Sequence, residues 1–123
     1  SFASEIKAID KVLERGLNGE RILALVDEPA RTTNPIEGSA LVSAFLKVLK
    51  GRSLSVVLTT HYNIKGDFFR RLRVSGLKDG EMDYTLIETD EADVPHEAIN
   101  VARSLKVNEQ WIDLAQNELD NNN

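Results

Sequence analysis

The sequence lacks several features that would place the protein in particular classes. It has no cysteine, which excludes disulfide bonds and thiolate metal sites. No apolar run approaches the roughly 20 residues of a membrane-spanning helix, and residues 1 to 5 lack the basic and apolar blocks of a signal peptide. A formal net charge of −5 disfavours a broad surface for nucleic-acid phosphates. We therefore expect a cytoplasmic domain that binds DNA poorly by itself.

One basic cluster stands apart from this acidic background. Its members are Arg70, Arg71 and Arg73, with Lys65 and Lys78 nearby. Such a cluster can be a nucleic-acid patch, or it can be the solvated edge of a strand. The overall charge favours the strand edge.

The first half of the chain has the pattern of a βαβ unit preceded by a helix. Apolar residues recur every three or four positions from Phe2, which predicts a helix that ends at Gly16 or Gly19. A continuous apolar run at 22–26 predicts a strand covered on both faces, and the mostly apolar segment 54–58 predicts a second buried strand, parallel to the first. Between them Asn34 and Pro35 are typical of a helix start, and this helix should reach Leu49 or Lys50.

The second half predicts a β-hairpin and two helices. Alternating apolar residues flank the turn at 78–80, which indicates the hairpin. An acidic loop over 88–93 should precede a helix that Pro95 opens and that runs to about Leu105. A last helix should begin at Asn108 and fray at its end, from Asp120 through the three asparagines. The fold class is therefore α/β.

Two adjacent carboxylates follow the first predicted strand. A charge beside a dry core is costly unless it has a partner, and magnesium phosphate is one such partner. In ATPases the first acid of such a pair holds Mg²⁺ and the second acts on the attacking water, which would assign these roles to Asp27 and Glu28. For the pair alone we favour the simpler interpretation that both acids cap the strand and face solvent.

The second strand changes that preference. It ends in Thr59, Thr60, His61 and Tyr62, and parallel neighbours deliver their carboxyl ends to one edge of a sheet. His61 can then lie beside the two acids and bond a terminal phosphate or the catalytic water. With both strands considered, a catalytic site becomes the favoured interpretation.

These residues resemble conserved motifs of the MutS family. The segment from Leu25 to Leu41, which begins Leu-Val-Asp-Glu-Pro-Ala-Arg-Thr-Thr-Asn-Pro, resembles the Walker B strand and the D-loop after it. Thr-Thr-His-Tyr at 59–62 resembles the histidine switch, and Ser1, Phe2 and Glu5 resemble the tail of the signature segment. The resemblance implies a partial P-loop NTPase core of the ABC-type ATPase class, with an added hairpin and C-terminal helices.

The resemblance also implies a division of labour between two subunits. In MutS dimers the signature segment and D-loop of one subunit complete the nucleotide site of the other. The implied contributors in trans are Ser1, Phe2, Arg31, Thr32, Thr33 and Asn34. The family pattern places the ATPase half at residues 1–92 and a helical element at 93–123. Trp111 and Leu114 of that element are candidate interface residues, with packing inside one chain as the equal alternative.

The sequence departs from the family pattern in two ways. The phosphate-binding loop Gly-x-x-x-x-Gly-Lys-Ser/Thr is absent. The family places it upstream, so we expect a piece of a longer protein, with an exposed strand edge, some self-association and no ATPase activity alone. In addition, Ala30 and Thr32 replace two glycines of the usual D-loop.

Three functions remain open. The leading one is a dimeric ATPase that uses ATP and Mg²⁺ to drive conformational change on DNA in mismatch repair or recombination, with DNA bound by domains outside this chain. The alternative is an accessory ATPase acting on a protein partner such as lysine 5,6-aminomutase, without DNA. The third is a dimerisation module without chemistry.

Overall fold

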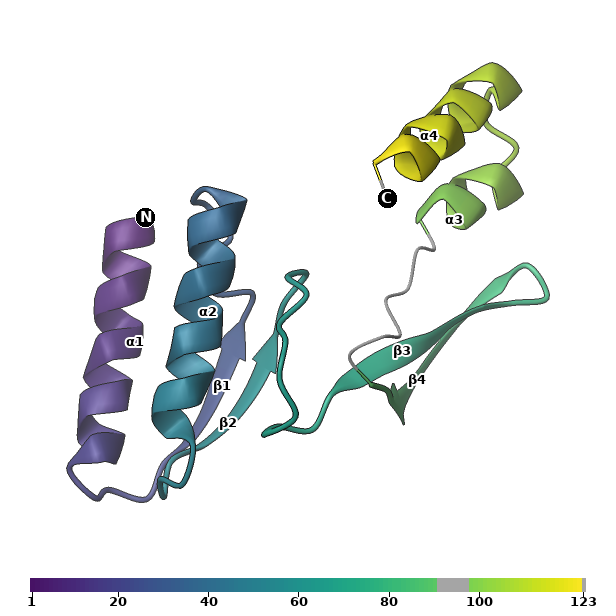
Figure 1. Cartoon of the computed structure of the whole chain (residues 1–123). Coiled ribbons are helices and arrows are strands. Elements are labelled where there is room, and N and C mark those ends of the chain that lie inside the picture. The colour runs from purple at the N-terminus through teal and green to yellow at the C-terminus, as the bar shows by residue number, and fades with distance from the viewer. Residues whose placement is uncertain (91–97, 123) are drawn as a thin grey trace. The chain divides into compact units, whose positions relative to one another are not determined.

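The computed structural model describes residues 1–90 and 98–122, which form two compact units. Unit 1 is Ser1–Phe68 and unit 2 is Phe69–Asn123 (Figure 1). The family-based boundary between residues 92 and 93 lies outside the described residues and stays a prediction. Among the described residues, no helix has the length and apolar character needed to cross a membrane.

Unit 1 contains the predicted helix and βαβ unit. Its elements are α1 (Phe2–Leu17), β1 (Leu23–Asp27), α2 (Pro35–Leu49) and β2 (Ser55–Thr59). The two strands pair in parallel, with Leu23 opposite Ser55 at one end and Asp27 opposite Thr59 at the other. The carboxyl ends of both strands therefore meet at one edge of the sheet.

Helix α2 begins where its capping residues predict. The Asn34 side chain accepts hydrogen bonds from the backbone N–H groups of Ile36 and Glu37, at 2.8 and 3.3 Å. Pro35 occupies the first turn, where its missing N–H costs no helical bond. After the helix, Gly51 has a φ of +77°, a conformation that glycine adopts without steric cost. Local chemistry alone thus defines both ends of α2.

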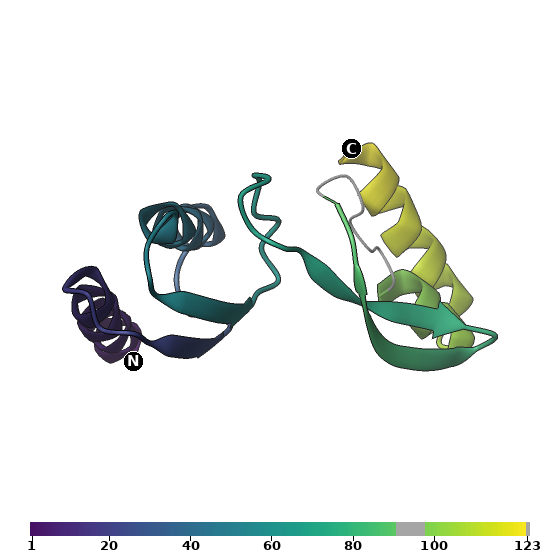
Figure 2. The ribbon, with the colours of Figure 1, turned by 90° about the horizontal axis from the view of Figure 1, so that it is seen from below.

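The prediction that β1 is covered on both faces and that β2 is buried is wrong for this chain. Leu23 and Leu25 of β1 are 66% and 76% exposed, and Val57 of β2 is 59% exposed. Figure 2 shows α1 and α2 over the same face of β1 and β2. Because successive side chains of a strand point to opposite faces, Leu23, Leu25 and Val57 face away from the helices. The alternate residues of each strand, such as Ala24, face the helices. The sheet therefore has one covered face and one bare apolar face.

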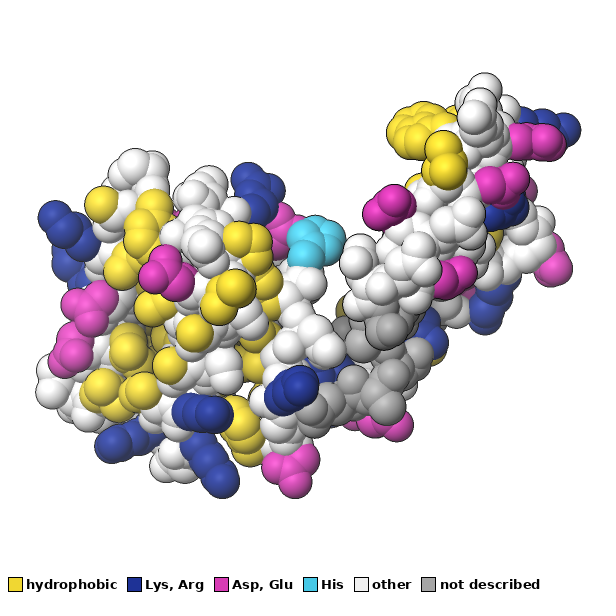
Figure 3. Space-filling view, turned by 45° about the horizontal axis from the view of Figure 1, so that its top comes forward, with side chains coloured by type: hydrophobic (Ala, Val, Ile, Leu, Met, Phe, Trp, Pro, Cys, Tyr) yellow, Lys and Arg dark blue, Asp and Glu magenta, His cyan; other side chains and the backbone are white. Residues whose placement is uncertain are grey.

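The core of unit 1 is small and lies between the helices and the sheet. Its most buried apolar residues are Ala24, Ala30, Val42, Leu54 and Ile64. Apolar side chains also reach the surface over α1 and α2 (Figure 3), and the large exposed ones on α2 are Ile36, Leu41 and Val48. Within the described part of the chain β1 pairs only with β2, so its other edge carries no strand.

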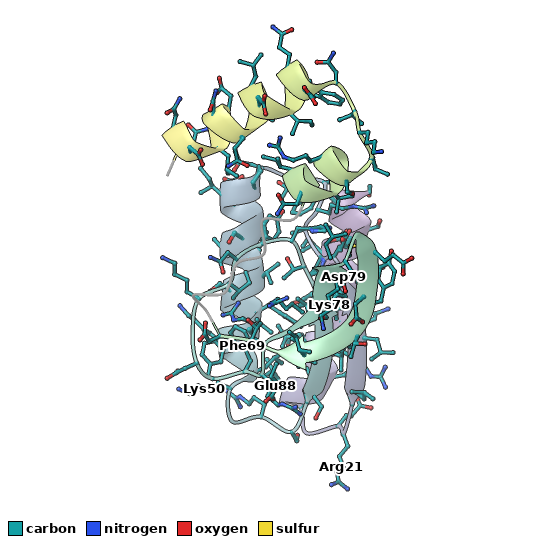
Figure 4. The ribbon with its side chains drawn as sticks, turned by 90° about the vertical axis from the view of Figure 1, so that its right-hand side faces the viewer. Arg21, Lys50, Phe69, Lys78, Asp79 and Glu88 are labelled. Carbon is teal, nitrogen blue, oxygen red and sulfur yellow. The ribbon has the colours of Figure 1, made fainter. Side chains whose placement is uncertain are left out.

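Unit 2 begins with the predicted hairpin, formed by β3 (Leu72–Lys78) and β4 (Glu81–Glu88) in antiparallel pairing. Asp79 and Gly80 connect the strands, with φ of 50° and 81°. Two central residues with positive φ match a tight hairpin turn whose twist suits the strands. Figure 4 shows Lys78 and Asp79 at one end of the hairpin and Glu88 at the other.

Two helices follow, α3 (Ala98–Ser104) and α4 (Glu109–Asn121). Asn108 caps α4 as predicted, since its side chain accepts from the Trp111 N–H at 3.0 Å. The helix continues through Asp120 and Asn121, where fraying was expected, and Asn122 is its C-cap, while Asn123 lies outside the described residues. Pro95, the predicted start of the preceding helix, lies outside the described residues.

The contact between these helices is partly polar. Ile112 of α4 is buried, and Arg103 of α3 forms an ion pair of 3.1 Å with Asp113 of α4. Trp111 and Leu114, the candidate interface residues, are 66% and 56% exposed. Both side chains are therefore accessible to a partner, and their role stays a prediction.

Candidate functional site

The two acids lie at the carboxyl edge of the sheet, where one threonine connects them. Thr59 is opposite Asp27 in the parallel pairing. Its hydroxyl donates to Asp27 Oδ1 at 2.6 Å and accepts from the Glu28 N–H at 3.0 Å. The same N–H also donates to the Thr59 carbonyl at 3.0 Å. Thr59 therefore fixes the position of both acids, a function that the sequence pattern did not reveal.

Glu28 is the most connected side chain of the site. Its Oε1 lies 2.6 Å from His61 Nε2, and its Oε2 lies 3.0 Å from Arg31 Nη1. The structure thus brings His61 and Glu28 together at the edge of the sheet. The carboxylate is 25% exposed, whereas the His61 and Arg31 side chains are 88% and 72% exposed. Since exposed ion pairs contribute little stability, Glu28 can give up either partner for another contact with little loss of free energy.

The backbone turns sharply at the acids. Glu28 and Ala30 have φ of 44° and 61°, the left-handed region that residues with a Cβ rarely adopt. Pro29 lies between them and is buried. Strained backbone of this kind persists where surrounding contacts hold it, and it concentrates at functional sites. Position 30 is one of the two where the family pattern has glycine, so the replacement falls at a position that takes the left-handed conformation.

Two further residues proposed to act in trans, Ser1 and Asn34, have local partners in this chain. Ser1 caps α1, because its hydroxyl accepts from the Ser4 N–H at 3.3 Å. Phe2 is the first residue of that helix and is half-buried. Asn34 caps α2. These local bonds account for Ser1 and Asn34 without a second subunit, so their role in trans stays a prediction.

The remaining two trans candidates, Thr32 and Thr33, lie in the turn between β1 and α2. Thr32 is exposed and Thr33 is half-buried. Neither is among the described non-glycine residues with positive φ, in contrast to Ala30. The structure thus explains a glycine preference at position 30 and gives no reason for one at position 32.

The donor set fits one kind of magnesium site. Among the described residues, no three or more His, Cys, Asp or Glu side chains are grouped to hold a metal ion. Mg²⁺ commonly binds through one or two carboxylates and completes its shell with phosphate oxygens and water. Asp27, exposed at the sheet edge, can serve as such a single carboxylate. The chain does not contain the loop that would hold the phosphates.

Four of the five residues of the basic cluster, all except Lys65, have partners within or beside the hairpin. Arg70 forms an ion pair of 2.7 Å with Glu88, and the guanidinium of Arg71 lies 4.9 Å from the centre of the Phe69 ring. Arg73 donates to the Val74 and Ser75 carbonyls at 2.9 and 3.2 Å. Lys78 lies 3.5 Å from Asp83. The carboxylates beside Arg70 and Lys78 agree with the strand-edge interpretation.

Thr59 gives a first test of the site in the complete protein. Thr59→Val keeps the β-branched shape and removes both hydroxyl bonds to the acids. Because each such bond contributes about 1 kcal/mol and about 1.4 kcal/mol is tenfold in rate, we expect the ATP hydrolysis that the sequence predicts to fall about five- to thirtyfold. The Mg²⁺ concentration for half-maximal rate should rise, because Asp27 loses its fixed orientation.

Thr59→Ser is the matched control, since it keeps the hydroxyl. Steady-state rates over a Mg²⁺ titration distinguish the two variants. Equal rates and equal Mg²⁺ dependence for the valine variant and the unmodified protein would show that Thr59 does not organise the acids.

Comparison with known proteins finds relatives that are named endonuclease MutS2. Endonuclease MutS2 of Carboxydothermus hydrogenoformans is 39% identical over 61 residues, which cover 50% of this chain and 8% of that protein. Endonuclease MutS2 of Clostridium botulinum strain ATCC 19397 is 28% identical over 130 aligned positions, covering the whole chain and 16% of the relative. The protein of the same name from Anaeromyxobacter sp. strain Fw109-5 is 39% identical over 61 residues, covering 50% of this chain and 7% of the relative.

These similarities support a relationship to the MutS family at low identity. No family model matches the chain, and no solved structure matches it. The chain spans between 7% and 16% of the length of these relatives.

Proposed function

We propose that this chain carries the hydrolytic end of the nucleotide site of a MutS-family ATPase. The observation that carries the proposal is the arrangement of Asp27, Glu28 and His61 at the carboxyl edge of two parallel strands, with Glu28 2.6 Å from His61. The similarity to MutS2 proteins supports the same conclusion. The nuclease activity in their name belongs to those proteins, and we do not assign it to this cluster.

Each residue of the cluster has a proposed role. Asp27 would hold magnesium, directly or through water, and the ion would supply charge neutralisation on the phosphates. Glu28 orients the attacking water and accepts its proton. His61 holds the Glu28 carboxylate and offers its imidazole to the same water or to the terminal phosphate. The phosphate-binding loop comes from sequence outside this chain.

The ion pair between Arg31 and Glu28 fits a role for the second subunit. A base whose two oxygens are both engaged has little capacity to bind water, and Arg31 engages one of them here. The pair is exposed and therefore weak. We propose that Arg31 leaves Glu28 when the loop after β1 contacts the other subunit of a homodimer, which frees that oxygen for water.

The test is steady-state ATP hydrolysis by the complete protein, with and without duplex DNA. Stimulation by DNA is the expected result. It would show that ATP hydrolysis is coupled to DNA, which we propose is bound by domains outside this chain. Hydrolysis indifferent to DNA would favour a protein partner such as lysine 5,6-aminomutase. Absence of hydrolysis under all conditions would overturn the proposal.

A further inference from the structure

The peptide groups of Ala30 are held from two sides by side chains distant in sequence. The Ala30 N–H donates to the carboxylate of Glu5 in α1. The Ala30 carbonyl accepts from the Tyr62 hydroxyl at 2.7 Å. Ala30 itself is only 1% exposed. One buried residue thus joins the first helix, the turn after β1 and the segment after β2.

These bonds act on a turn whose backbone is unfavourable by itself. Ala30 has a φ of 61° and Glu28 a φ of 44°, conformations in which a Cβ is crowded. A backbone group buried without a partner is also costly, so both bonds favour the observed conformation. The conformation of this turn also determines where the Glu28 side chain points, because only Pro29 separates Glu28 from Ala30.

Tyr62 is also the immediate neighbour of His61. The same short segment therefore presents an imidazole to Glu28 and a phenol to Ala30, at 2.6 and 2.7 Å. Within that segment the Tyr62 N–H donates to the Thr60 hydroxyl at 3.0 Å, which fixes the local backbone. A shift of the backbone of this segment would therefore displace both side chains together.

Gly38 makes room for this arrangement. A Cβ at position 38 would lie 2.4 Å from the Tyr62 hydroxyl oxygen and 2.9 Å from the Ala30 carbonyl oxygen. Both are closer than real Cβ atoms approach such atoms, so only glycine allows the phenol to reach the carbonyl. The contact between Tyr62 and Ala30 therefore also depends on the glycine at position 38 of α2.

We propose that Glu5 and Tyr62 are positioning residues that clamp Ala30 and thereby hold Glu28 against His61. They set the rate of hydrolysis without touching the nucleotide. This inference rests on the proposed function for its effect on hydrolysis, whereas the clamp itself can be tested without nucleotide.

The kinetic test uses three variants of the complete protein. Tyr62→Phe keeps the ring and removes the donor, and Glu5→Met keeps the approximate size and removes the acceptor. We expect each to lower kcat for ATP hydrolysis about tenfold, the effect of a misplaced catalytic group, with KM for ATP changed less than about twofold. Glu5→Gln keeps an acceptor oxygen for the Ala30 N–H and should restore most of the rate.

Matched controls separate the clamp from the chemical change alone. Tyr84→Phe removes a phenol from an aromatic residue that is 74% exposed. Glu14→Met removes a carboxylate from the exposed side of α1. Neither should change kcat.

The second readout is amide hydrogen exchange of the segment 28–33 without nucleotide. We expect faster exchange in Tyr62→Phe and Glu5→Met, unchanged exchange in Glu5→Gln, and unchanged exchange over residues 42–49 of α2 in all three. Unchanged exchange over 28–33 in the first two variants would overturn the clamp, as would equal loss of kcat in Glu5→Gln.

The two proposals fail differently. If Glu28→Gln abolishes hydrolysis while Tyr62→Phe and Glu5→Met keep full kcat, the positioning role is wrong and the proposed function stands. If Glu28→Gln hydrolyses ATP normally, the proposed function fails and no positioning role remains for the clamp, whatever the exchange shows.

Discussion

Replacing Glu28 with glutamine in the complete protein should lower ATP hydrolysis about 10²-fold or more, the usual loss when a general base is removed. ATP binding should stay nearly unchanged, because on the proposed function the phosphates are held by a loop outside this chain. Glutamine keeps the size of the side chain and an oxygen for its neighbours, so the turn should survive. Steady-state rates and equilibrium binding of a labelled nucleotide, measured on one preparation, separate the two effects.

Glu37→Gln is the control for that experiment. Glu37 lies in the first turn of α2 and is exposed, so the same change in charge is made a few residues from the site without touching the base. Its hydrolysis rate should equal that of the unmodified protein. Unreduced hydrolysis by Glu28→Gln itself would leave this chain as a dimerisation module, the third function that the sequence allows.

The second large effect is expected at Gly38, where alanine should destabilise a helix that it would ordinarily strengthen. In an exposed helix, glycine to alanine gains about 1 kcal/mol. At position 38 the new Cβ would lie 2.4 Å from the Tyr62 hydroxyl oxygen and 2.9 Å from the Ala30 carbonyl oxygen. Since one of these atoms is backbone, the turn itself must move. We expect a net loss of about 1 to 3 kcal/mol in the free energy of unfolding, typical of overpacking.

Hydrolysis should fall with it, by tenfold or more, because the displaced turn carries Glu28. Ser39→Ala, at the next position of the same helix, has no such contact to break and serves as the control for both readouts. Chemical denaturation and steady-state kinetics are the measurements. A Gly38→Ala protein that is more stable than the unmodified protein, as helix propensity alone would give, would contradict the close packing of Tyr62 over α2.

Elements that depend on local chemistry could be predicted from the sequence. Asn34 and Pro35 define the start of α2 through a cap and a fixed φ, and Asp79 and Gly80 define the hairpin through positive φ. Each signal acts over a few residues, so it needs no knowledge of the rest of the fold. The parallel βαβ unit follows from the order of such elements.

The burial of the sheet could not be predicted in the same way. Leu23 and Leu25 are apolar whether or not a layer covers them, so the sequence predicts a covered strand and the structure shows an exposed face. The apolar residues of a strand show that its face can be buried. Whether the face is buried depends on another helix or strand that packs against it. In this chain both helices of unit 1 lie on the other face.

For the site, the sequence predicts the meeting of strand ends and misses the contacts that hold it. His61 could be placed beside Glu28 because parallel strands share an edge. The sequence does not predict the hydrogen bonds of Thr59, Glu5 and Tyr62. These bonds depend on the strand register and on the left-handed turn at Ala30. Two features of the sequence could have indicated these contacts. They are a polar residue at the end of the second strand, opposite Asp27, and a tyrosine directly after the histidine.

The most direct test of the account is a structure of the complete protein with Mg²⁺ and a non-hydrolysable ATP analogue. We expect Asp27 at the metal ion, directly or through one water, and Glu28 within hydrogen-bonding distance of the water that faces the terminal phosphate. Arg31 should then have left Glu28, and the bonds of Ala30 to Glu5 and Tyr62 should remain. A nucleotide bound with Asp27 and Glu28 both facing away from its phosphates would contradict the central claim.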